Sequence, residues 1–416
     1  MMTSAPAAAW MDSRADAVPE FAPTVDISVS SRFHAFDLAH EMSERRMLRT
    51  LHTGYPAFLV ASRFSVPRRS VQSVWTGEPL NRALTHLHRT GVTGRPDAFI
   101  CQRHDRIVAS RLKPGADVFI GWSGQCRMSL AAARRFGMTT IVERGSTHIE
   151  WQRHLLEEEA RATRLRVDVP DDATVGQELA EYSAADYIAV PSAFAASTFI
   201  SRGVPASKLL VNPYGVDLRL FARHAAVNHD RTPHDGSLRV LHVGQVSARK
   251  GVHYLVDAVA RVPGAVVTLV GAAEPTVAAR IAQSRSARIA GPVAGRELPR
   301  WYENADVFCL LSIEEGLALV IAQAMAMGLP VIATPNTGAE ELIDDGVTGF
   351  IVPARNSAAA ADRLQLLADN RRLRDDMGQR ARARVADGFG WSHYGERARA
   401  SYARIVAHAR GSVTSR

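Results

Sequence analysis

The stretch from Ser312 to Ala333 constrains the fold of this chain most; it reads SIEEGLALVIAQAMAMGLPVIA. It follows an apolar, strand-like run over 306–311 and ends in a second such run over 330–333. Residues 318–327 between them are good helix formers with no breaker. The stretch therefore predicts strand, turn, helix and strand, which is the repeating unit of a parallel α/β sheet.

Glu314, Glu315 and Gly316 occupy the predicted turn. The turn lies at the carboxyl end of a strand, where ligands bind in open α/β sheets. The free N–H groups that begin the next helix favour an anionic ligand such as a phosphate. The two carboxylates are hydrogen-bond acceptors that suit sugar hydroxyls. The turn is therefore a candidate ligand site.

Length and composition predict a globular protein of two domains. The chain has 416 residues, 46% of them hydrophobic and 22% charged, which is too long for one compact core. No apolar run approaches the ~20 residues of a membrane span. Residues 1–24 lack a basic start and a long apolar core, so we expect a disordered leader rather than a signal peptide. The three scattered cysteines favour the reducing cytoplasm.

The net charge of +8 comes almost entirely from arginine. It reflects either genomic base composition or attraction to anionic partners, such as nucleotide phosphates or acidic membrane headgroups. No basic track interleaved with aromatic residues accompanies it, so we do not expect nucleic-acid binding.

A second candidate ligand loop follows the predicted strand 238–244. The loop Gln245–Gly251 contains Arg249 and Lys250 and leads into a predicted helix over 252–261. It is not a P-loop, because it has no Gly-Lys-Ser/Thr run, and it lacks the G-x-G-x-x-G of a nicotinamide site. We therefore predict that this loop binds phosphate and that Lys250 supplies the positive charge.

The stretch 312–333 resembles the donor-site segment of retaining glycosyltransferases of family 4, which have the two-domain GT-B fold. That family shows a Glu, seven residues and a second Glu, followed by Ala-Met-Ala-x-Gly-x-Pro-Val. Glu315 matches the first Glu and Ala324–Val331 the tail, whereas Gln323 stands where the second Glu is expected. The loop 245–251 is similar to the family's diphosphate-binding loop, with Lys250 on its lysine and Gln245 in place of its arginine.

The resemblance extends to the domain boundaries. Residues 204–217 resemble the end of the family's first domain, and Phe389-Gly-Trp391 resembles the element at which the chain crosses back. It implies an α/β GT-B protein with two doubly wound Rossmann-like domains facing each other across a cleft. We expect an acceptor-binding domain over 25–222, a donor-binding domain over 223–390, and a crossover helix over 391–416 that packs on the first domain.

Over residues 25–184 the resemblance to the family is mostly architectural. We expect a strand over 25–29, a helix from about 33 to 54, and a strand over 57–60, and we assign no role to residues 62–115. A charged helix over 151–166 is predicted to expose Glu157, Glu158 and Glu159 to solvent. The strand Thr139–Glu143 leads into a loop, Arg144–His148, that faces the cleft in the family.

The resemblance implies a set of site residues. His148 lines the reaction centre or, alternatively, only caps the next helix. Catalysis is expected to use His148, Glu315 and Lys250. The expected donor-binding residues are Gln245, Arg249, Lys250, Val293, Glu315, Gly316, Leu317 and Gln323. The acceptor-side candidates are Arg32, His34, Glu143 and Arg144.

The implied function is transfer of a hexose-type sugar from a nucleotide diphosphate sugar, with retained configuration and without a metal or cofactor. The acceptor is a glycan, a lipid-linked compound or a small molecule, as in cell-surface polysaccharide or glycoconjugate biosynthesis. The expected location is the cytoplasm, with peripheral contact to an anionic inner membrane face as an option. Two alternatives stay open: another GT-B enzyme, such as a sugar-nucleotide epimerase or phosphorylase, and a non-catalytic protein that binds sugar nucleotides or glycans.

Overall fold

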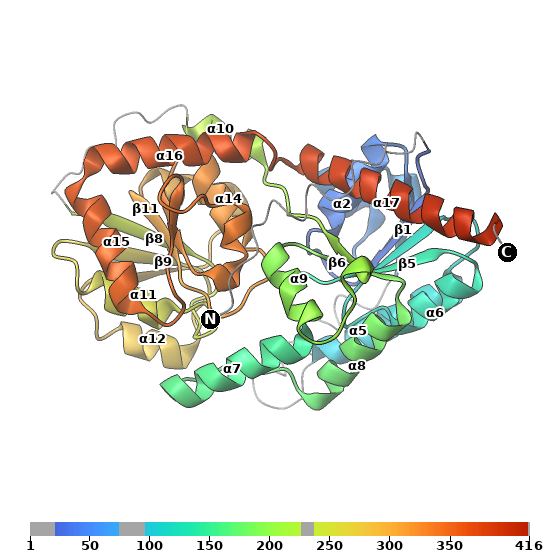
Figure 1. Cartoon of the computed structure of the whole chain (residues 1–416), viewed down its shortest axis with the longest axis horizontal. Helices are drawn as coiled ribbons and strands as arrows, with labels where there is room; N and C mark the ends of the chain where they lie inside the picture. The colour runs from blue at the N-terminus through green and yellow to red at the C-terminus, as the bar shows by residue number, and fades with distance from the viewer. Residues whose placement is uncertain (1–20, 75–95, 226–236, 415–416) are drawn as a thin grey trace.

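The computed structural model describes residues 21–74, 96–225 and 237–414. They form two lobes side by side, each a parallel sheet with helices on both faces (Figure 1). We call the lobe on the seven-stranded sheet the first domain and the lobe on the six-stranded sheet the second domain. The predicted α/β class with two doubly wound sheets is confirmed. Residues 1–20 of the expected leader lie outside the described residues, and so do residues 226–236 near the start of the expected donor-binding domain.

The first sheet has the strand order β3-β2-β1-β4-β5-β6-β7. Its central strands are buried throughout, because helices cover both faces, and this is why they read as continuous apolar runs. Its strands are β1 (Val25–Val29), β2 (Leu48–Thr53), β3 (Val71–Ser73), β4 (Val118–Trp122), β5 (Thr139–Glu143), β6 (Tyr187–Val190) and β7 (Leu209–Val211). Its helices are α2 (Ala35–Glu44), α3 (Ala57–Phe64), α5 (Pro96–Arg111), α6 (Arg127–Arg135), α7 (Ile149–Thr163), α8 (Asp172–Ala184) and α9 (Ala193–Ile200).

Two predictions near the start of the first domain are wrong. The expected helix from 33 to 54 ends at Glu44, and its second half is the strand β2, which pairs with β1. The expected strand over 57–60 is the helix α3, which starts after Pro56. Met47 and Leu51 are buried as the pattern required, but Leu51 enters the core from the strand β2 and Met47 from the residue just before it, not from a helix.

The second sheet has the order β10-β9-β8-β11-β12-β13, so the strand order reverses between β8 and β11. Ligands of doubly wound sheets bind at this reversal. Its strands are β8 (Arg239–Val243), β9 (Val266–Val270), β10 (Ala287–Gly291), β11 (Val307–Leu310), β12 (Val331–Ala333) and β13 (Gly349–Ile351). The helices that follow the first domain are α10 (Leu218–Ala225), α11 (Val252–Val259), α12 (Pro275–Ile281), α13 (Leu298–Glu303), α14 (Leu319–Ala326), α15 (Ser357–Asp369), α16 (Arg371–Ala386) and α17 (Trp391–Thr414).

The last helix, α17, leaves the second domain and lies along the first, beside α2 (Figure 1). A backbone hydrogen bond stabilises this crossing: the N–H of Val216 donates to the carbonyl of Phe389 at 2.8 Å. Arg397 adds hydrogen bonds to the Asn212 side chain at 2.9 Å and the Pro213 carbonyl at 2.7 Å. Two chain segments far apart in sequence therefore join the domains at this edge.

The helix α7 bridges the domains, which corrects one expectation. Glu159 was predicted to face solvent, but its side chain is fully buried. It accepts hydrogen bonds from His253 Nε2 at 3.0 Å and from Arg355 Nε at 2.8 Å, both in the second domain. The neighbouring domain covers this face of α7, which a helical charge pattern by itself does not reveal. No helix in the described ranges has the length and hydropathy needed to cross a membrane.

Candidate functional site

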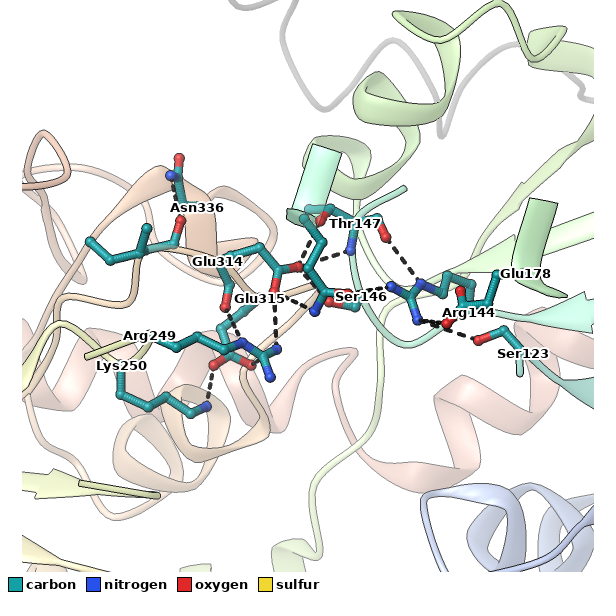
Figure 2. A network of polar contacts seen from close by, with 12 residues as sticks. Ser123, Arg144, Ser146, Thr147, Glu178, Arg249, Lys250, Glu314, Glu315 and Asn336 are labelled. Carbon is teal, nitrogen blue, oxygen red and sulfur yellow. Dashed lines mark hydrogen bonds and ion pairs between the residues drawn. The ribbon is translucent and has the colours of Figure 1, made fainter. Parts of the chain in front are cut away.

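The loops that follow β8 and β11 meet, because these strands are neighbours at the reversal of the second sheet. Lys250 Nζ forms an ion pair with Glu315 Oε1. Arg249 Nη2 lies 3.1 Å from Glu314 Oε2 and 3.9 Å from Glu315 Oε2. Figure 2 shows the two cations facing the two carboxylates. Three residues predicted to bind the donor, namely Arg249, Lys250 and Glu315, thus lie in one cluster.

Glu314 is the centre of this cluster, although it was not among the predicted site residues. Its buried carboxylate accepts hydrogen bonds from the hydroxyls of Ser146 and Thr147, the latter at 2.7 Å, and from Gln152 Nε2 at 2.9 Å. All three residues belong to the first domain: Ser146 and Thr147 lie in the loop after β5 (Figure 2), and Gln152 lies in α7. Glu314 therefore joins the loop after β5 to the loop after β11.

The surroundings of Glu314 keep it ionised. Burial by itself would raise the pKa of this carboxyl. The Arg249 guanidinium and the hydrogen bonds from Ser146 and Thr147 outweigh burial and lower the pKa to about 2. The carboxylates act in turn on Arg249: burial would lower the pKa of its guanidinium, but Glu314 and Glu315 raise it. Glu314 and Arg249 are thus both charged at neutral pH.

Arg144, predicted on the acceptor side, supports this junction from the first domain. It is buried, and its Nε donates to the Thr147 carbonyl at 3.0 Å. Its Nη1 pairs with Glu178 at 3.0 Å and its Nη2 donates to Gln152 Oε1 at 2.8 Å. Arg144 therefore positions Thr147 and Gln152, two of the three first-domain residues that donate to Glu314.

The backbone of the turn touches the first domain. A Cβ at Gly316 would lie 2.7 Å from the carbonyl carbon of Gly145 and 2.8 Å from Ser146 Cα. The Gly316 carbonyl accepts a hydrogen bond from Ser192 Oγ at 2.6 Å. Glu315 N–H donates to the Asn336 carbonyl at 2.8 Å. Only glycine permits this approach of two loops, and the domains are closed on each other here.

His148 lies at the start of α7, next to Thr147. Its Nδ1 accepts a hydrogen bond from the Glu150 N–H at 3.3 Å, which caps the helix. Its ring packs against Tyr182 and Phe199, with centroids 5.3 and 4.9 Å away, and is only 3% exposed. Burial first, and then Arg202 and Arg144, lower its pKa to about 4. The imidazole is hence neutral at pH 7 and sits inside the first domain.

The acceptor-side candidates His34 and Glu143 lie together. His34 Nε2 is 2.9 Å from Glu143 Oε1, and the ring packs on Trp122 and Tyr214, with centroids 5.0 and 4.1 Å away. The hydroxyl of Tyr214 is buried and has no hydrogen-bond partner among the described residues. Arg32 lies apart from this pair: it is exposed and stacks 4.9 Å above the Phe64 ring.

The remaining donor-side candidates contact other side chains. Gln245 Nε2 donates to Glu274 at 3.3 Å, and Gln323 Oε1 accepts from the Tyr302 hydroxyl at 3.0 Å. Val293 follows β10 and packs, partly buried, against the core below α13 and α14. Leu317 is buried beside Gly316. Ser146, Thr147 and Gln152 were not among the predicted site residues; the signal for Ser146 and Thr147 was their place in the loop Arg144–His148, which faces the cleft in the family, whereas Gln152 lies in α7.

Comparison with known proteins agrees with this architecture. Residues 237–370 match the family model "Glycosyl transferases group 1". A curated relative, D-inositol 3-phosphate glycosyltransferase of Kribbella flavida, is 31% identical over 218 residues, which are 48% of this chain and 51% of the relative. The chain thus spans about half the length of the curated relatives it matches.

Solved structures match nearly the whole chain at low identity. Sucrose-phosphate synthase from Thermosynechococcus elongatus has a TM-score of 0.70 and 18% identity, and covers 93% of this chain and 100% of its own. Anabaena HepE in complex with UDP and glucose has a TM-score of 0.63 and 16% identity, covering 94% and 100%. The chain has the GT-B fold, and its second domain is similar to the group 1 glycosyl transferases over the matched residues 237–370.

Proposed function

We propose that this protein transfers a hexose-type sugar from a nucleotide diphosphate sugar to an acceptor. The main observation that supports this proposal is the cluster of Arg249 and Lys250 with Glu315 at the carboxyl ends of β8 and β11. Two cations there can hold a diphosphate, and a carboxylate beside them can accept hydrogen bonds from sugar hydroxyls. The fold neighbour HepE is described in complex with UDP and glucose, which supports a donor of this class.

The roles follow from the charges. As the glycosidic bond breaks, negative charge grows on the leaving nucleoside diphosphate, and cations fixed beside it stabilise the transition state. Arg249 and Lys250 are already oriented by the carboxylates. The donor diphosphate would replace Glu315 as partner of Lys250, which frees Glu315 for the sugar. Retention of configuration is part of the proposal and comes from the resemblance of residues 312–333. Independence from a metal is also part of it, because the sequence has no Asp-x-Asp at the end of a predicted strand.

The acceptor in this proposal is a carbohydrate or lipid-linked compound that meets the donor from the first domain, near His34 and Glu143. Contact with an anionic membrane would suit a lipid-linked acceptor; Phe33 and Phe58, 57% and 63% exposed, lie on the first domain near Arg32. Flotation with anionic vesicles tests the contact, and absence of salt-sensitive binding would remove it.

A thermal-shift screen against UDP, GDP, ADP, TDP and their sugar conjugates tests the donor site. We expect one base to raise the melting temperature, Lys250→Ala to abolish the shift, and Glu315→Ala to lose only the sugar-dependent part. Lys113→Ala, an exposed lysine of the first domain, is the matched control. With a competent acceptor, Lys250→Ala should lower kcat by about 10²–10³-fold.

Product analysis separates the remaining classes. Sugar appearing on an added acceptor supports the transferase, whereas a changed nucleotide sugar without acceptor indicates an epimerase. Binding with no product under either condition would favour the non-catalytic alternative, to which the neutral Gln245 and Gln323 point. No shift with any nucleotide would contradict the donor site itself.

A further inference from the structure

A cavity of about 800 Å³ lies in the second domain at the amino ends of β8 and β9, whereas the donor loops follow the carboxyl ends of β8 and β11. Its floor includes Arg239 and Leu241 of β8, Val266 and Thr268 of β9, and Arg288 of β10. The strand register pairs these positions side by side, and they alternate along each strand, so they share one face of the sheet. The helix α13 forms the opposite wall.

The cavity follows from the topology. β10 is the edge strand of the sheet, and α13, which packs over this face, has only six residues. The face beside β10 is therefore left partly open, and Val266 is 42% exposed there. The volume is in the range of small-molecule sites.

The charge of the cavity is positive. Arg239 is bound by Asp306, with contacts of 3.0 and 2.9 Å. The exposed residues Arg285, Arg288 and Arg300 also line the cavity, and none has an acidic partner among the residues that the structure describes. Among the described residues that line the cavity, Glu297 carries the one carboxylate. Three unpaired guanidinium groups against one carboxylate leave two net positive charges.

The cavity also offers apolar surface. Val266 and the half-buried indole of Trp301 lie among the arginines. Guanidinium groups bind phosphate or carboxylate through paired N–H donors, and both they and an indole stack on planar groups.

We propose that this cavity binds a small anionic molecule with an aromatic or apolar body, at a site separate from the donor site. The anionic group would lie between Arg288 and Arg300, and the body on Val266 and Trp301. The site lies at the amino ends of β8 and β9, whereas Lys250 and Glu315 follow the carboxyl ends of β8 and β11. One ligand of this size class therefore does not span both.

Isothermal titration with 1-naphthyl phosphate tests the proposal, because this probe joins an aromatic body to a phosphate. We expect binding that the double variant Arg288→Ala/Arg300→Ala weakens at least tenfold. Inorganic phosphate and 1-naphthol, which carry only one part each, should bind more weakly than the probe. Arg288 and Arg300 are exposed, as are the two arginines changed in the control variant described below. We therefore expect all these variants to fold.

The matched control is Arg371→Ala/Arg380→Ala, which removes the same charge from exposed positions of α16. This variant and Lys250→Ala should bind the probe as the unchanged protein does. Equal affinity in Arg288→Ala/Arg300→Ala, or no binding by the unchanged protein, would overturn the proposal. Loss of binding in Lys250→Ala would overturn it too, because the probe would then occupy the donor site.

Discussion

Glu314 and Glu315 are adjacent and chemically identical, yet the structure gives them different tasks. The side chain of Glu314 is fully buried and bonded by residues of both domains, whereas that of Glu315 keeps 13% of its surface exposed and contacts mainly Lys250. A ligand can take over the partners of Glu315 without burying an unpaired charge. Displacing Glu314 would leave a buried carboxylate uncompensated. We therefore propose that Glu314 positions the loops and that Glu315 binds the ligand.

Glu314→Gln should lower the free energy of unfolding by about 3 kcal/mol, because a buried ionic partner of Arg249 is lost while the side-chain shape is kept. Glu340→Gln, at an exposed position, is the control. Urea titration measures both. A glutamine variant as stable as the unchanged protein would show that the charge of Glu314 is dispensable.

The same residue predicts a pH dependence. Its pKa in the folded protein, about 2, lies below the ordinary value of 4.5. The ionised form is thus favoured by folding, and its contribution is complete above pH 4.5 and lost as the pH falls from 4.5 toward 2. The size is about 3 kcal/mol. The unchanged protein should lose this stability in acid urea titrations, and Glu314→Gln should lose correspondingly less.

Gln323→Glu tests the departure from the family pattern. A carboxylate forms stronger, charge-assisted hydrogen bonds to a ribose diol than an amide does. It can also still accept from the Tyr302 hydroxyl, as Gln323 does at 3.0 Å. We expect tighter donor binding by about tenfold in a titration. Unchanged affinity would argue that Gln323 does not touch the ribose.

At the scale of elements, α7 connects the domains at two places. Its first turn supplies Gln152, which donates to Glu314, and its later turns supply Glu159, which binds His253 and Arg355. Both contacts bury a carboxylate between the domains. The helix therefore determines where the donor loops sit relative to the loop after β5.

Arg355→Ala should weaken this connection. It removes the bond to Glu159 at 2.8 Å and the bond to the Leu155 carbonyl at 3.2 Å, and leaves the buried Glu159 with fewer donors. We expect a loss of about 2 kcal/mol in unfolding free energy. Arg153→Ala, on the same helix, breaks only solvent-accessible ion pairs, with Glu157 of α7 and with Asp172 of α8, and should cost less than about 1 kcal/mol. Equal losses in the two variants would contradict a role for Arg355 between the domains.

At the scale of the whole molecule, the structure is closed around the donor cluster. The turn at Gly316 touches Gly145 and Ser192 of the first domain, and Glu314 is sealed below it. In the proposed function, entry of a nucleotide sugar requires some separation of the domains, followed by closure that excludes water. The chain crosses between the domains just before α17. We therefore expect the two domains to pivot at this crossing.

Gly316→Ala should hold the domains apart, since its Cβ would overlap backbone atoms of Gly145 and Ser146. Small-angle X-ray scattering should show a larger radius of gyration, and transfer activity should fall. Gly176→Ala places a Cβ where no atom lies within 4 Å and should change neither. An unchanged radius of gyration in Gly316→Ala would show that the loops can yield locally.

Much of this arrangement could be predicted from local sequence. The unit from β11 to β12, the helices α15 and α16, and the loops with Lys250 and Glu315 follow from apolar periodicity and from turn residues at strand ends. These signals lie within a few residues of the feature that they determine. The helix expected over 33–54 shows the limit, because the local pattern suits a helix while pairing with β1 makes residues 48–53 a strand.

Only the tertiary structure decided which charges are buried. Glu314 meets Ser146 and Thr147, and Glu159 meets His253 and Arg355, across long stretches of chain. Nothing near Glu159 in sequence distinguishes it from the more exposed Glu157 and Glu158. The domain that covers it makes the difference, since a carboxylate is kept in the interior only where distant donors compensate its lost hydration. The sequence by itself determined most of the strands and helices and the two loops proposed to bind the ligand, and the packing of the two domains determined which polar residues join them.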